Sequence, residues 1–437
     1  MKILHFLPWY TSTYSGGTEQ YMINLAKAQK LNGNVVEIIQ PNFEIEDSVS
    51  CVEGIKINLF SYPDSIKDPQ FLFGLVSYYD FTSFRDCLLD FKPDIIHFHV
   101  TDARFKYLHK IIKEFNIPTL ITPHYVGFSC PDGTLKQNDK KQCNGSVEMF
   151  KCSNCIINKN KRVPNYLKFI LAGTINILFT ITPLKFRHKI KLLGLPFRIH
   201  YKKKFLQYLR ESPNIKFDVL NKWYADVLNM IDINSNSISI LNNEYVNKNN
   251  YSNISKKEFT GKLKLLFVGR ISYSKGVKTI TDAFKKLNEY KDDMELTLIG
   301  DMSEKEMEIQ LIELIKQGYT INIEGIYPNE AVQKKMKEYD FLIFPSVANE
   351  MLPLTIQEAI CSDLPIIASN LLGCKALVLE GINGYFFKAD DTVDLTKLLT
   401  EIILKRKSLA FKFDKSEDIN YDKVAYYEKL YNHFLTT

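Results

Sequence analysis

The chain has 437 residues, which is long for one hydrophobic core and suits two domains of ordinary size. Apolar residues make up 45% of the sequence and charged residues 24%, a globular composition that excludes an intrinsically disordered chain. The net charge of +6 is a mild excess, so the distribution of charge along the chain carries more information than its sum.

No targeting or membrane-spanning segment is predicted. The sustained apolar run that a signal peptide requires does not precede Pro8. The longest apolar stretch without charge, residues 169–184, is shorter than a spanning helix and contains Gly173, Asn176 and Pro183. We therefore expect a cytoplasmic protein that is peripheral on the inner face of the cell membrane, and no disulfides among its eight cysteines.

The N-terminal half alternates strands and helices. An amphipathic helix is predicted over residues 18–31, and Gly33 stands just past its end, where a helix cap favours a positive φ. Strand, helix and strand in this order indicate a parallel sheet covered by helices. Runs rich in Ile, Val and Phe predict strands over residues 3–7, 35–39, 55–60, 95–98 and 119–121.

The same alternation begins again after the polar, Asn-rich residues 242–255, which we interpret as an interdomain linker. Residues 421–434 at the end of the chain predict a final amphipathic helix. The sequence thus indicates an α/β protein of two similar domains. The strands predicted in the second half are residues 263–268, 296–300, 321–325, 341–345 and 366–369.

Two strand–helix turns carry candidate phosphate-binding residues. Gly16 and Gly17 stand before the first helix, where free amides, the helix dipole and close backbone approach favour an anion. A plain tight turn explains these two glycines as well. Arg270 and Lys275 follow the first strand of the second half and can clamp a diphosphate, although solvated surface charges are the simpler interpretation.

The loop after the predicted strand 341–345 carries the strongest motif. Pro353 suits the first turn of a helix, so Glu350 precedes that helix and Glu358 lies within it. In an open α/β sheet, ligands bind beyond the carboxyl ends of the strands, where this loop lies. One carboxylate can accept from sugar hydroxyls and the other from a ribose diol. Two surface glutamates on an amphipathic helix are the alternative.

In their order along the chain, these motifs resemble the retaining glycosyltransferases of the GT-B fold known as family four, the glycosyl transferases of group 1. The resemblance implies an α/β fold in which two Rossmann-like domains with parallel sheets face a central cleft. It extends from near residue 1 to about residue 390. The matching segments are residues 15–19, 94–99, 268–270, 275–276, 344–346, 365–369 and 381–387, together with Glu350 and Glu358.

The resemblance also implies a domain organisation. An N-terminal acceptor domain is expected over residues 1–241, with a Cys-rich and basic insert at about 128–210. A nucleotide-sugar-binding domain is expected over residues 256–418, and a helix over 420–437 is expected to cross back to the first domain.

Roles for the donor-binding residues come from the same resemblance. Arg270 and Lys275 would hold the donor diphosphate, and Glu358 would bind the ribose. Leu352 and Leu354, which flank Pro353, are counted among the donor-binding residues.

Two further roles concern the reacting sugar. Glu350 would bind the donor sugar, and Gly16 and Gly17 would place the N-terminal loop against donor phosphate or acceptor. His124 stands where family members often carry a histidine near the reacting sugar, and a polar loop histidine is the alternative. Both Glu350 and His124 are therefore counted as catalytic, whereas His97 and His99 are interpreted as structural.

The expected mechanism needs no metal cofactor. No Asp-x-Asp motif stands at a suitable strand end, so Arg270, Lys275 and helix dipoles would stabilise the diphosphate. The resemblance implies retention of anomeric configuration, with the leaving diphosphate as acceptor of the proton, and no protein nucleophile is nominated. The chain departs from the usual family pattern at residues 351–353 and 372–376, so the resemblance does not identify the donor.

Four cysteines cluster in the insert. Cys130, Cys143, Cys152 and Cys155 end in a C-x2-C pair, which suits a structural zinc site with four sulfur ligands. Only one half of the cluster has the tight spacing, and four free thiols are the alternative.

A basic and apolar segment follows the cysteines. Residues 156–210 contain 13 Lys or Arg and no Asp or Glu, so the rest of the chain sums to −7. Basic and apolar residues together suit an anionic membrane face or a lipid-linked diphosphate acceptor. A solvated helical insert is the alternative, and no nucleic-acid partner is expected because no such motif is present.

The sequence thus predicts a hexosyltransferase that uses a nucleotide-diphosphate sugar. Its acceptor would be a glycan, lipid-linked in the expected pathway of surface polysaccharide biosynthesis. The alternatives are a non-catalytic protein of the same fold that binds a membrane or a partner, and a sugar-nucleotide epimerase.

Overall fold

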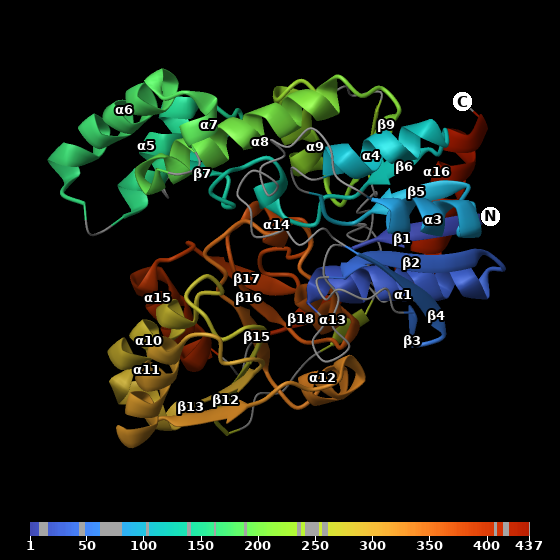
Figure 1. The fold of residues 1–437 in the computed structure, drawn as a ribbon. Coiled ribbons are helices and arrows are strands. Elements are labelled where there is room, and N and C mark those ends of the chain that lie inside the picture. The colour runs from blue at the N-terminus through green and yellow to red at the C-terminus, as the bar shows by residue number, and fades with distance from the viewer. Residues whose placement is uncertain are drawn as a thin grey trace. The chain divides into compact units, whose positions relative to one another are not determined.

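The computed structural model divides into two compact units, and Figure 1 shows the fold of each. Unit 1 comprises Met1–Asn242 and Asp418–Thr437, and unit 2 comprises Asn243–Glu417. Ser15 and most of the expected linker, residues 242–252, lie outside the described residues. The described residues are 1–7, 16–42, 49–61, 81–101, 105–137, 141–160, 163–187, 190–233, 237–240, 253–255, 261–405, 409–413 and 419–436.

Unit 1 is built on an eight-stranded sheet in the order β10-β9-β6-β5-β1-β2-β4-β3. Every neighbouring pair is parallel except β3 and β4. The register places His5 of β1 beside His97 of β5. The strands are β1 (Lys2–Phe6), β2 (Val35–Asn42), β3 (Val49–Val52), β4 (Ile55–Ser61), β5 (Ile95–Phe98), β6 (Thr119–Ile121), β9 (Ile215–Val219) and β10 (Ile238–Ile240).

The last helix of the chain is part of unit 1. The hydroxyl of Tyr427 on α16 lies 2.9 Å from the hydroxyl of Tyr21 on α1, and Tyr427 and Tyr431 are fully buried. A buried tyrosine hydroxyl requires a polar partner, so these contacts fix how α16 lies on α1. The helices packed with this sheet are α1 (Gly17–Leu31), α3 (Thr82–Phe91), α4 (Phe105–Glu114), α9 (Lys222–Met230) and α16 (Ile419–Thr436).

Four further helices gather at one end of unit 1, drawn in green in Figure 1. Phe179 of α6 packs with Phe197 and Tyr201 of α8 in a small core of their own. No described helix is both long enough and apolar enough to span a membrane. The helices are α5 (Met149–Lys159), α6 (Asn165–Ile181), α7 (Leu184–Arg187) and α8 (Gly194–Arg210), preceded by the antiparallel pair β7 (Lys136–Gln137) and β8 (Lys141–Gln142).

Unit 2 contains a six-stranded parallel sheet in the order β14-β13-β12-β15-β16-β17. All four residues of β15 and all four of β16 are buried, as expected for parallel strands covered on both faces. The strands are β12 (Leu263–Val268), β13 (Met294–Ile299), β14 (Thr320–Glu324), β15 (Phe341–Phe344), β16 (Ile366–Ser369) and β17 (Gly384–Phe387), with β11 (Asn253–Ser255) and β18 (Phe411–Phe413) as a separate antiparallel pair.

The helices of unit 2 connect these strands. They pack hydrophobic side chains onto the sheet, so that Ile280 and Phe284 of α10 and Leu311 of α11 join the same core as β12 and β13. The helices are α10 (Val277–Lys286), α11 (Lys305–Lys316), α12 (Asn329–Met336), α13 (Leu354–Cys361), α14 (Leu372–Lys375) and α15 (Thr392–Lys405).

Both sheets reverse their strand order beside their first parallel strand. In unit 2, β13 and β14 lie on one side of β12, and β15 lies on the other. In unit 1, β2 and β5 flank β1 in the same way. Ligands of open α/β sheets bind at such switch points, beyond the carboxyl ends of the strands. The topology therefore selects two places for functional residues, one in each unit.

The predicted α/β architecture with two parallel sheets is confirmed. The predicted strands are present, several with the predicted boundaries and the others shifted by at most three residues at either end. Gly33 has the expected positive φ of 84°. The sequence analysis missed β9, although Ile215–Val219 alternates apolar and polar residues as a strand does. Pro353 is the N-cap of α13 and so stands one position earlier than a first-turn residue.

Candidate functional site

The start of α10 lies directly against the end of β15. Gly276, the N-cap of α10, has a φ of 78°, and a Cβ there would lie 1.8 Å from the carbonyl oxygen of Pro345. The backbone N–H of Val347 also donates to the carbonyl of Ser274 at 3.1 Å. Only glycine satisfies both the positive φ and the close approach. The turn after β12 and the loop after β15 therefore lie side by side at the switch point of unit 2.

Lys275 and Glu350 meet at this contact. The Lys275 Nζ donates to the Glu350 Oε1 at 2.6 Å, and the Ser346 Oγ donates to the same oxygen at 3.0 Å. Both side chains of the ion pair are half-buried, so the pair is held more firmly than a surface pair. Within the described part of the chain, the Glu350 Oε2 has no hydrogen-bond donor. That oxygen can accept from a ligand hydroxyl.

A second close approach fixes the loop that carries Glu350. A Cβ on Gly373 of α14 would lie 1.9 Å from the carbonyl oxygen of Glu350. Leu352 is buried in the same loop, and Leu354 begins α13 in a half-buried position. The free amides of the first turn of α13 thus follow Glu350 by only a few residues, which suits an anionic ligand.

Glu358 lies one helical turn further along α13. Burial raises the pKa of its carboxyl to about 7, although a hydrogen bond with Asn329 opposes the shift. Glu358 is half-buried, and no described residue pairs a positive charge with it. Partial burial of an unpaired carboxylate is costly, and a ligand that donates hydroxyl hydrogen bonds would stabilise its charged form. Glu358 is therefore poised to bind a diol.

Arg270 follows β12 at the same edge of the sheet. Its side chain is exposed, and it makes no hydrogen bond or ion pair with any residue that the structure describes. Gly269 has a φ of 147°, and a Cβ on Gly300 would lie 2.0 Å from the Gly269 carbonyl oxygen. The backbone at the end of β12 is thus tightly fixed, while the guanidinium remains available for an anion.

Gly16 and Gly17 stand at the start of α1, at the switch point of unit 1. Gly16 is the N-cap of α1 with an extended conformation, and Gly17 is its first residue. A Cβ on Gly16 would lie 2.8 Å from the Glu19 Oε2. The Glu19 carboxylate therefore lies beside the start of α1. Phosphate binding by the amides of this helix start stays a prediction.

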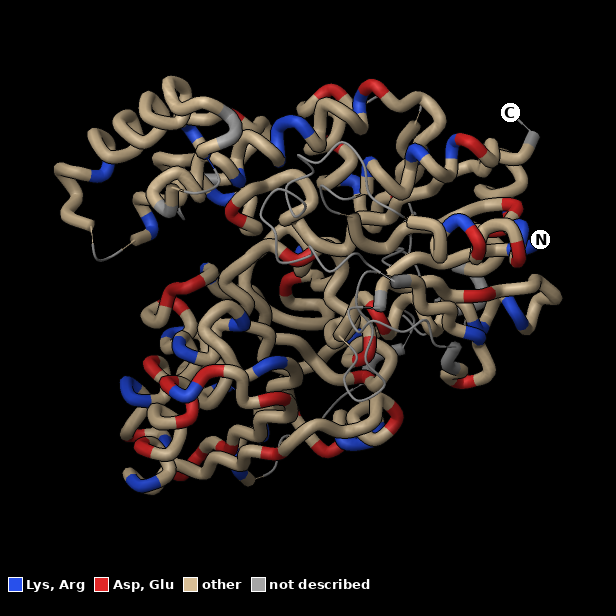
Figure 2. The backbone as a smooth tube through the Cα atoms, viewed as in Figure 1, with Lys and Arg blue, Asp and Glu red and all other residues tan. Residues whose placement is uncertain are grey.

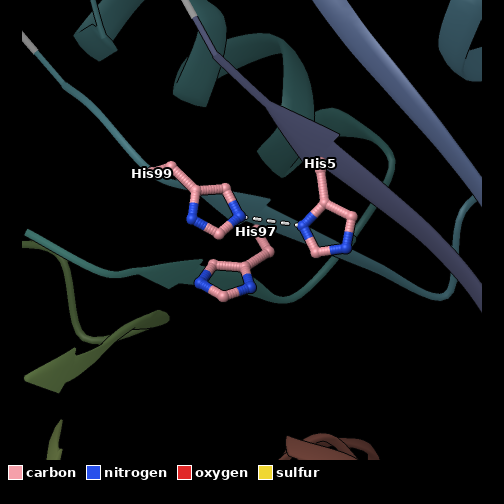
Figure 3. A group of neighbouring side chains, drawn as sticks. All are labelled: His5, His97 and His99. Atoms are coloured by element: carbon pink, nitrogen blue, oxygen red, sulfur yellow. Dashed lines mark hydrogen bonds between the residues drawn. The ribbon is translucent and has the colours of Figure 1, made fainter. Parts of the chain in front are cut away.

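Three fully buried histidines meet at the same switch point (Figure 3). His5 comes from β1, His97 from β5 and His99 from just beyond β5, and one nitrogen of each lies within 4.8 Å of the others. Every ring nitrogen of the three has a hydrogen-bond partner, so no lone pair is left for a metal ion. Burial lowers the pKa of His5 to about 4 and holds the other two well below the usual range.

His124 extends this cluster beyond the end of β6. Its Nε2 lies 3.1 Å from the Nδ1 of His99, and its ring meets the edge of Tyr21 at a centroid distance of 4.8 Å. Burial lowers the pKa of His124 to about 3, so the ring is neutral at pH 7. Unlike the other three, His124 is only half-buried. It is therefore the member of the cluster that a ligand can reach.

The four clustered cysteines all lie in unit 1 as free thiols. Cys152 and Cys155 stand one turn apart on α5, and burial together with nearby Cys130 and Cys143 raises the pKa of Cys152 to about 11. Among the described residues, only the histidine group places three metal-ligand atoms within 4.8 Å of one another. A zinc ion would have to draw these sulfurs closer together.

Sequence reasoning did not identify Asp218, which lies at the far end of the histidine cluster. Asp218 is fully buried in β9 and accepts from the hydroxyls of Tyr426 at 2.5 Å and Tyr427 at 2.7 Å. Burial raises the pKa of Asp218 to about 7. A lone carboxylate between Phe217 and Val219 was the available signal, because charged residues are seldom buried without a role.

Two family models match the chain, Glycosyltransferase Family 4 over residues 15–144 and Glycosyl transferases group 1 over residues 250–416. A lipopolysaccharide 1,2-N-acetylglucosaminetransferase of Salmonella typhimurium is 28% identical over 164 residues, 34% of this chain and 43% of the relative. The amylovoran biosynthesis glycosyltransferase AmsK of Erwinia amylovora is 25% identical over 148 residues, 32% of this chain and 36% of the relative. The matches span less than half the length of these two relatives.

Solved structures match nearly the whole chain. Sucrose-phosphate synthase from Thermosynechococcus elongatus has a TM-score of 0.59 at 14% identity and covers 99% of both chains. Anabaena HepE in complex with UDP has a TM-score of 0.54 at 12% identity, covering 98% of this chain and 95% of that one. Identities this low show the fold, which is that of a GT-B glycosyltransferase. The two family models together match more than half of the chain. The chain therefore belongs to the family-four glycosyltransferases, which the group 1 model also describes.

The buried charge of Glu358 predicts a pH-dependent stability difference. In the folded protein the pKa of Glu358 is about 7, above its ordinary value of 4.5. The buried charge therefore does not lower the free energy of unfolding below pH 4.5, and it lowers it by the full amount above pH 7. Relative to the wild type, Glu358→Gln should gain up to about 3 kcal/mol in free energy of unfolding between pH 4.5 and pH 8. Urea unfolding at both pH values measures the gain.

The exposed Glu330 on α12 provides the matched control, and Glu330→Gln should show no such gain. An equal difference between Glu358→Gln and the wild type at both pH values would contradict the burial of a charged carboxylate.

Proposed function

We propose that this protein is a retaining glycosyltransferase that moves a hexose from a nucleotide-diphosphate sugar to a glycan acceptor. The observation that carries the proposal is the Lys275–Glu350 ion pair, held with Ser346 at the switch point of the unit 2 sheet. Arg270 follows the end of β12, and Glu358 lies on α13. The set combines cations for a diphosphate with carboxylates for hydroxyl groups.

Each residue has a distinct role in this proposal. Arg270 and Lys275, with the first-turn amides of α13, hold the diphosphate and stabilise the charge that develops as it leaves. Glu358 accepts from the ribose diol. Glu350 binds the donor sugar through the oxygen that its protein partners leave available, and Leu352 and Leu354 pack beside the donor.

In the proposed reaction, the acceptor hydroxyl attacks the anomeric carbon on the face that the diphosphate leaves. The glycosidic bond forms as the bond to the diphosphate oxygen breaks, and that oxygen takes the acceptor proton. His124, with Gly16 and Gly17 in unit 1, contacts the reacting sugar or the acceptor. Retention rests on the family resemblance.

Nucleotide binding tests the donor site. HepE, of the same fold, was solved with UDP and UDP-glucose, so UDP-glucose heads a panel that includes GDP- and ADP-sugars. A ligand at 100 times its Kd should add about 2.7 kcal/mol to the free energy of unfolding. Arg270→Ala and Glu358→Ala should each weaken binding by roughly 10- to 100-fold, because each removes a hydrogen bond to a charged group. Thermal shift measures both effects.

Lys285→Ala is the matched control, because Lys285 stands in the last turn of α10 and away from the diphosphate site. It should bind the donor as the wild type does. If no nucleotide sugar stabilises the protein, the non-catalytic alternative is favoured. If a nucleotide sugar is isomerised without any acceptor, the protein is an epimerase and the transferase proposal fails.

We further propose that the acceptor is lipid-linked and that α6 docks on an anionic membrane. One face of α6, with Ala172, Ile175 and Phe179, is buried in the helical insert. The opposite face is also apolar: Ile170 and Ile177, seven residues apart, are 61% and 64% exposed. A helix that is apolar on both faces requires a second apolar environment.

The charge of this region favours a lipid surface as the partner. Figure 2 shows that α6 carries almost no charge, and residues 156–210 contain no acidic residue. Lys168 and Arg187 donate to backbone carbonyls within the insert, whereas Arg198, Lys203 and Lys204 remain exposed on α8. Exposed basic residues attract the anionic headgroups while the apolar face enters the boundary with the acyl chains.

Vesicle sedimentation of the full chain tests the membrane proposal. Binding to vesicles that contain phosphatidylglycerol should exceed binding to pure phosphatidylcholine and should weaken in high salt. The double variant Ile170→Ser/Ile177→Ser should bind at least about tenfold more weakly, because each buried Ile contributes roughly 1.5–3 kcal/mol. Leu404→Ser, an equally exposed apolar position on α15 of unit 2, should bind as the wild type does.

Unchanged vesicle binding by the double variant would overturn this assignment. A monomer–dimer equilibrium that the double variant abolishes, without any vesicle binding, would identify a second copy of the chain as the partner of α6 instead.

We also propose a structural zinc ion bound by Cys130, Cys143, Cys152 and Cys155. Zinc would replace the proton that burial holds on Cys152 and would bring its three neighbours together. The purified protein should contain one zinc, and Cys152→Ser should lose it with a fall in stability, whereas Cys361→Ser in unit 2 should not. Metal analysis measures the content, and a zinc-free wild type means four free thiols.

A further inference from the structure

A continuous series of side-chain hydrogen bonds crosses unit 1 from Asp218 to His124. Thr122 forms a hydrogen bond with the Asp218 carboxylate, and its hydroxyl lies 2.7 Å from the Nε2 of His97. The Nδ1 of His97 lies 2.7 Å from the hydroxyl of Tyr431.

The series continues from Tyr431 to the other histidines. The Tyr431 hydroxyl accepts from Gln29 at 3.2 Å, and the Oε1 of Gln29 lies 2.8 Å from the Nε2 of His5. His5 reaches His99 at 2.9 Å, and His99 reaches His124 at 3.1 Å.

The direction of the series follows from its Asp218 end. Burial raises the pKa of Asp218 to about 7, so above about pH 8 the carboxyl is ionised and only accepts hydrogen bonds. The Thr122 hydroxyl then donates to it. The Thr122 oxygen must then accept from His97, which places the proton of His97 on Nε2. A neutral imidazole carries one proton, so the Nδ1 of His97 accepts from the Tyr431 hydroxyl.

The same reasoning continues to His5. The Tyr431 hydroxyl donates its only proton to the Nδ1 of His97. Its oxygen therefore accepts a hydrogen bond from the Gln29 Nε2. The amide of Gln29 therefore turns its Oε1 toward His5. His5 must donate from Nε2, which leaves its Nδ1 as an acceptor.

The last two links run from His5 to His124. The Nδ1 of His5 accepts from the Nε2 of His99, so the Nδ1 of His99 is unprotonated. That nitrogen accepts from the Nε2 of His124. The one proton of the neutral His124 ring is thus on Nε2, and its Nδ1 carries a bare lone pair. Burial, which lowers the pKa of all four rings, keeps them neutral as this assignment requires.

We infer that Asp218, Thr122 and Gln29 are positioning residues that hold His124 as the Nε2–H tautomer, with Nδ1 presented as an acceptor for a substrate hydroxyl. The inference rests on the proposed function only for the identity of that hydroxyl. His124 is the half-buried member at the end of the series, whereas the other three rings are fully buried. The C-terminal helix α16 takes part directly, because it supplies Tyr431 and the two tyrosines that fix Asp218.

Nitrogen NMR of the full chain labelled with ¹⁵N-histidine tests the inference, because it distinguishes protonated from unprotonated ring nitrogens. Above about pH 8, where Asp218 is ionised, wild-type His124 should show a protonated Nε2 and an unprotonated Nδ1. Gln29→Met, which keeps the side-chain length and removes both hydrogen bonds, should give a mixture of tautomers at His124.

Thr122→Val provides a second, nearly isosteric variant that cuts the series beside Asp218, and it should also yield mixed tautomers. His109, which bonds to Tyr208 outside the series, is the internal control and should not change in any variant. A protonated Nδ1 on wild-type His124 would overturn the inference, and so would a single tautomer in both Gln29→Met and Thr122→Val. One metal ion bound per chain at His5, His97 and His99 would also overturn it.

The NMR result does not depend on catalysis. If the expected tautomers are found but no sugar is transferred, the proposed function fails and the positioning assignment stands. If transfer is observed with the opposite tautomer, the positioning assignment alone fails.

Discussion

The interaction on which unit 2 depends is a backbone contact that only glycine permits. Gly276 lets α10 begin against the carbonyl of Pro345, and Gly373 lets α14 approach the carbonyl of Glu350 in the same way. A side chain at either position would push the end of β15 away from its neighbours. Lys275 and Glu350 are 75 residues apart in the sequence, yet the Lys275 Nζ lies 2.6 Å from the Glu350 Oε1. They meet because the glycine contacts hold the two loops against each other. The ion pair is thus a consequence of backbone packing.

The sequence could predict this part of the molecule because its signals are local. Most strands of the parallel sheet in unit 2 are short runs rich in apolar residues. Arg270, Lys275 and Glu350 follow the ends of β12 and β15 closely, so the topological rule for parallel sheets places them on one edge. Pairing of individual side chains is different. Nothing in residues 346–358 shows that Lys275 and Ser346 would share one oxygen of Glu350, since that depends on where α10 begins.

Unit 1 shows why the rest could not be predicted. His97 and Tyr431 are 334 residues apart, and Asp218 and Tyr427 are separated by 209. Periodicity identifies α16 as an amphipathic helix, but in the sequence Tyr426 and Tyr427 look like ordinary core residues. Only the structure shows that both hydroxyls donate to the Asp218 carboxylate of β9. The residues of β9 alternate apolar and polar, so in the sequence Asp218 looks like a strand residue that faces solvent. Its burial follows from long-range contacts with α16, which no local pattern reports.

Two carboxylates, Glu350 in unit 2 and Asp218 in unit 1, are stabilised in different ways. In unit 2, a half-buried carboxylate keeps a lysine as its partner, so the charges of Lys275 and Glu350 offset each other and one oxygen remains for a ligand. In unit 1, no cation among the described residues contacts Asp218, and three hydroxyl groups compensate its burial. A carboxylate held by neutral donors orients every group that follows it, because each donor has only one proton to give. The ion pair therefore supports binding, whereas the neutral series is suited to fixing the orientation of a single ring.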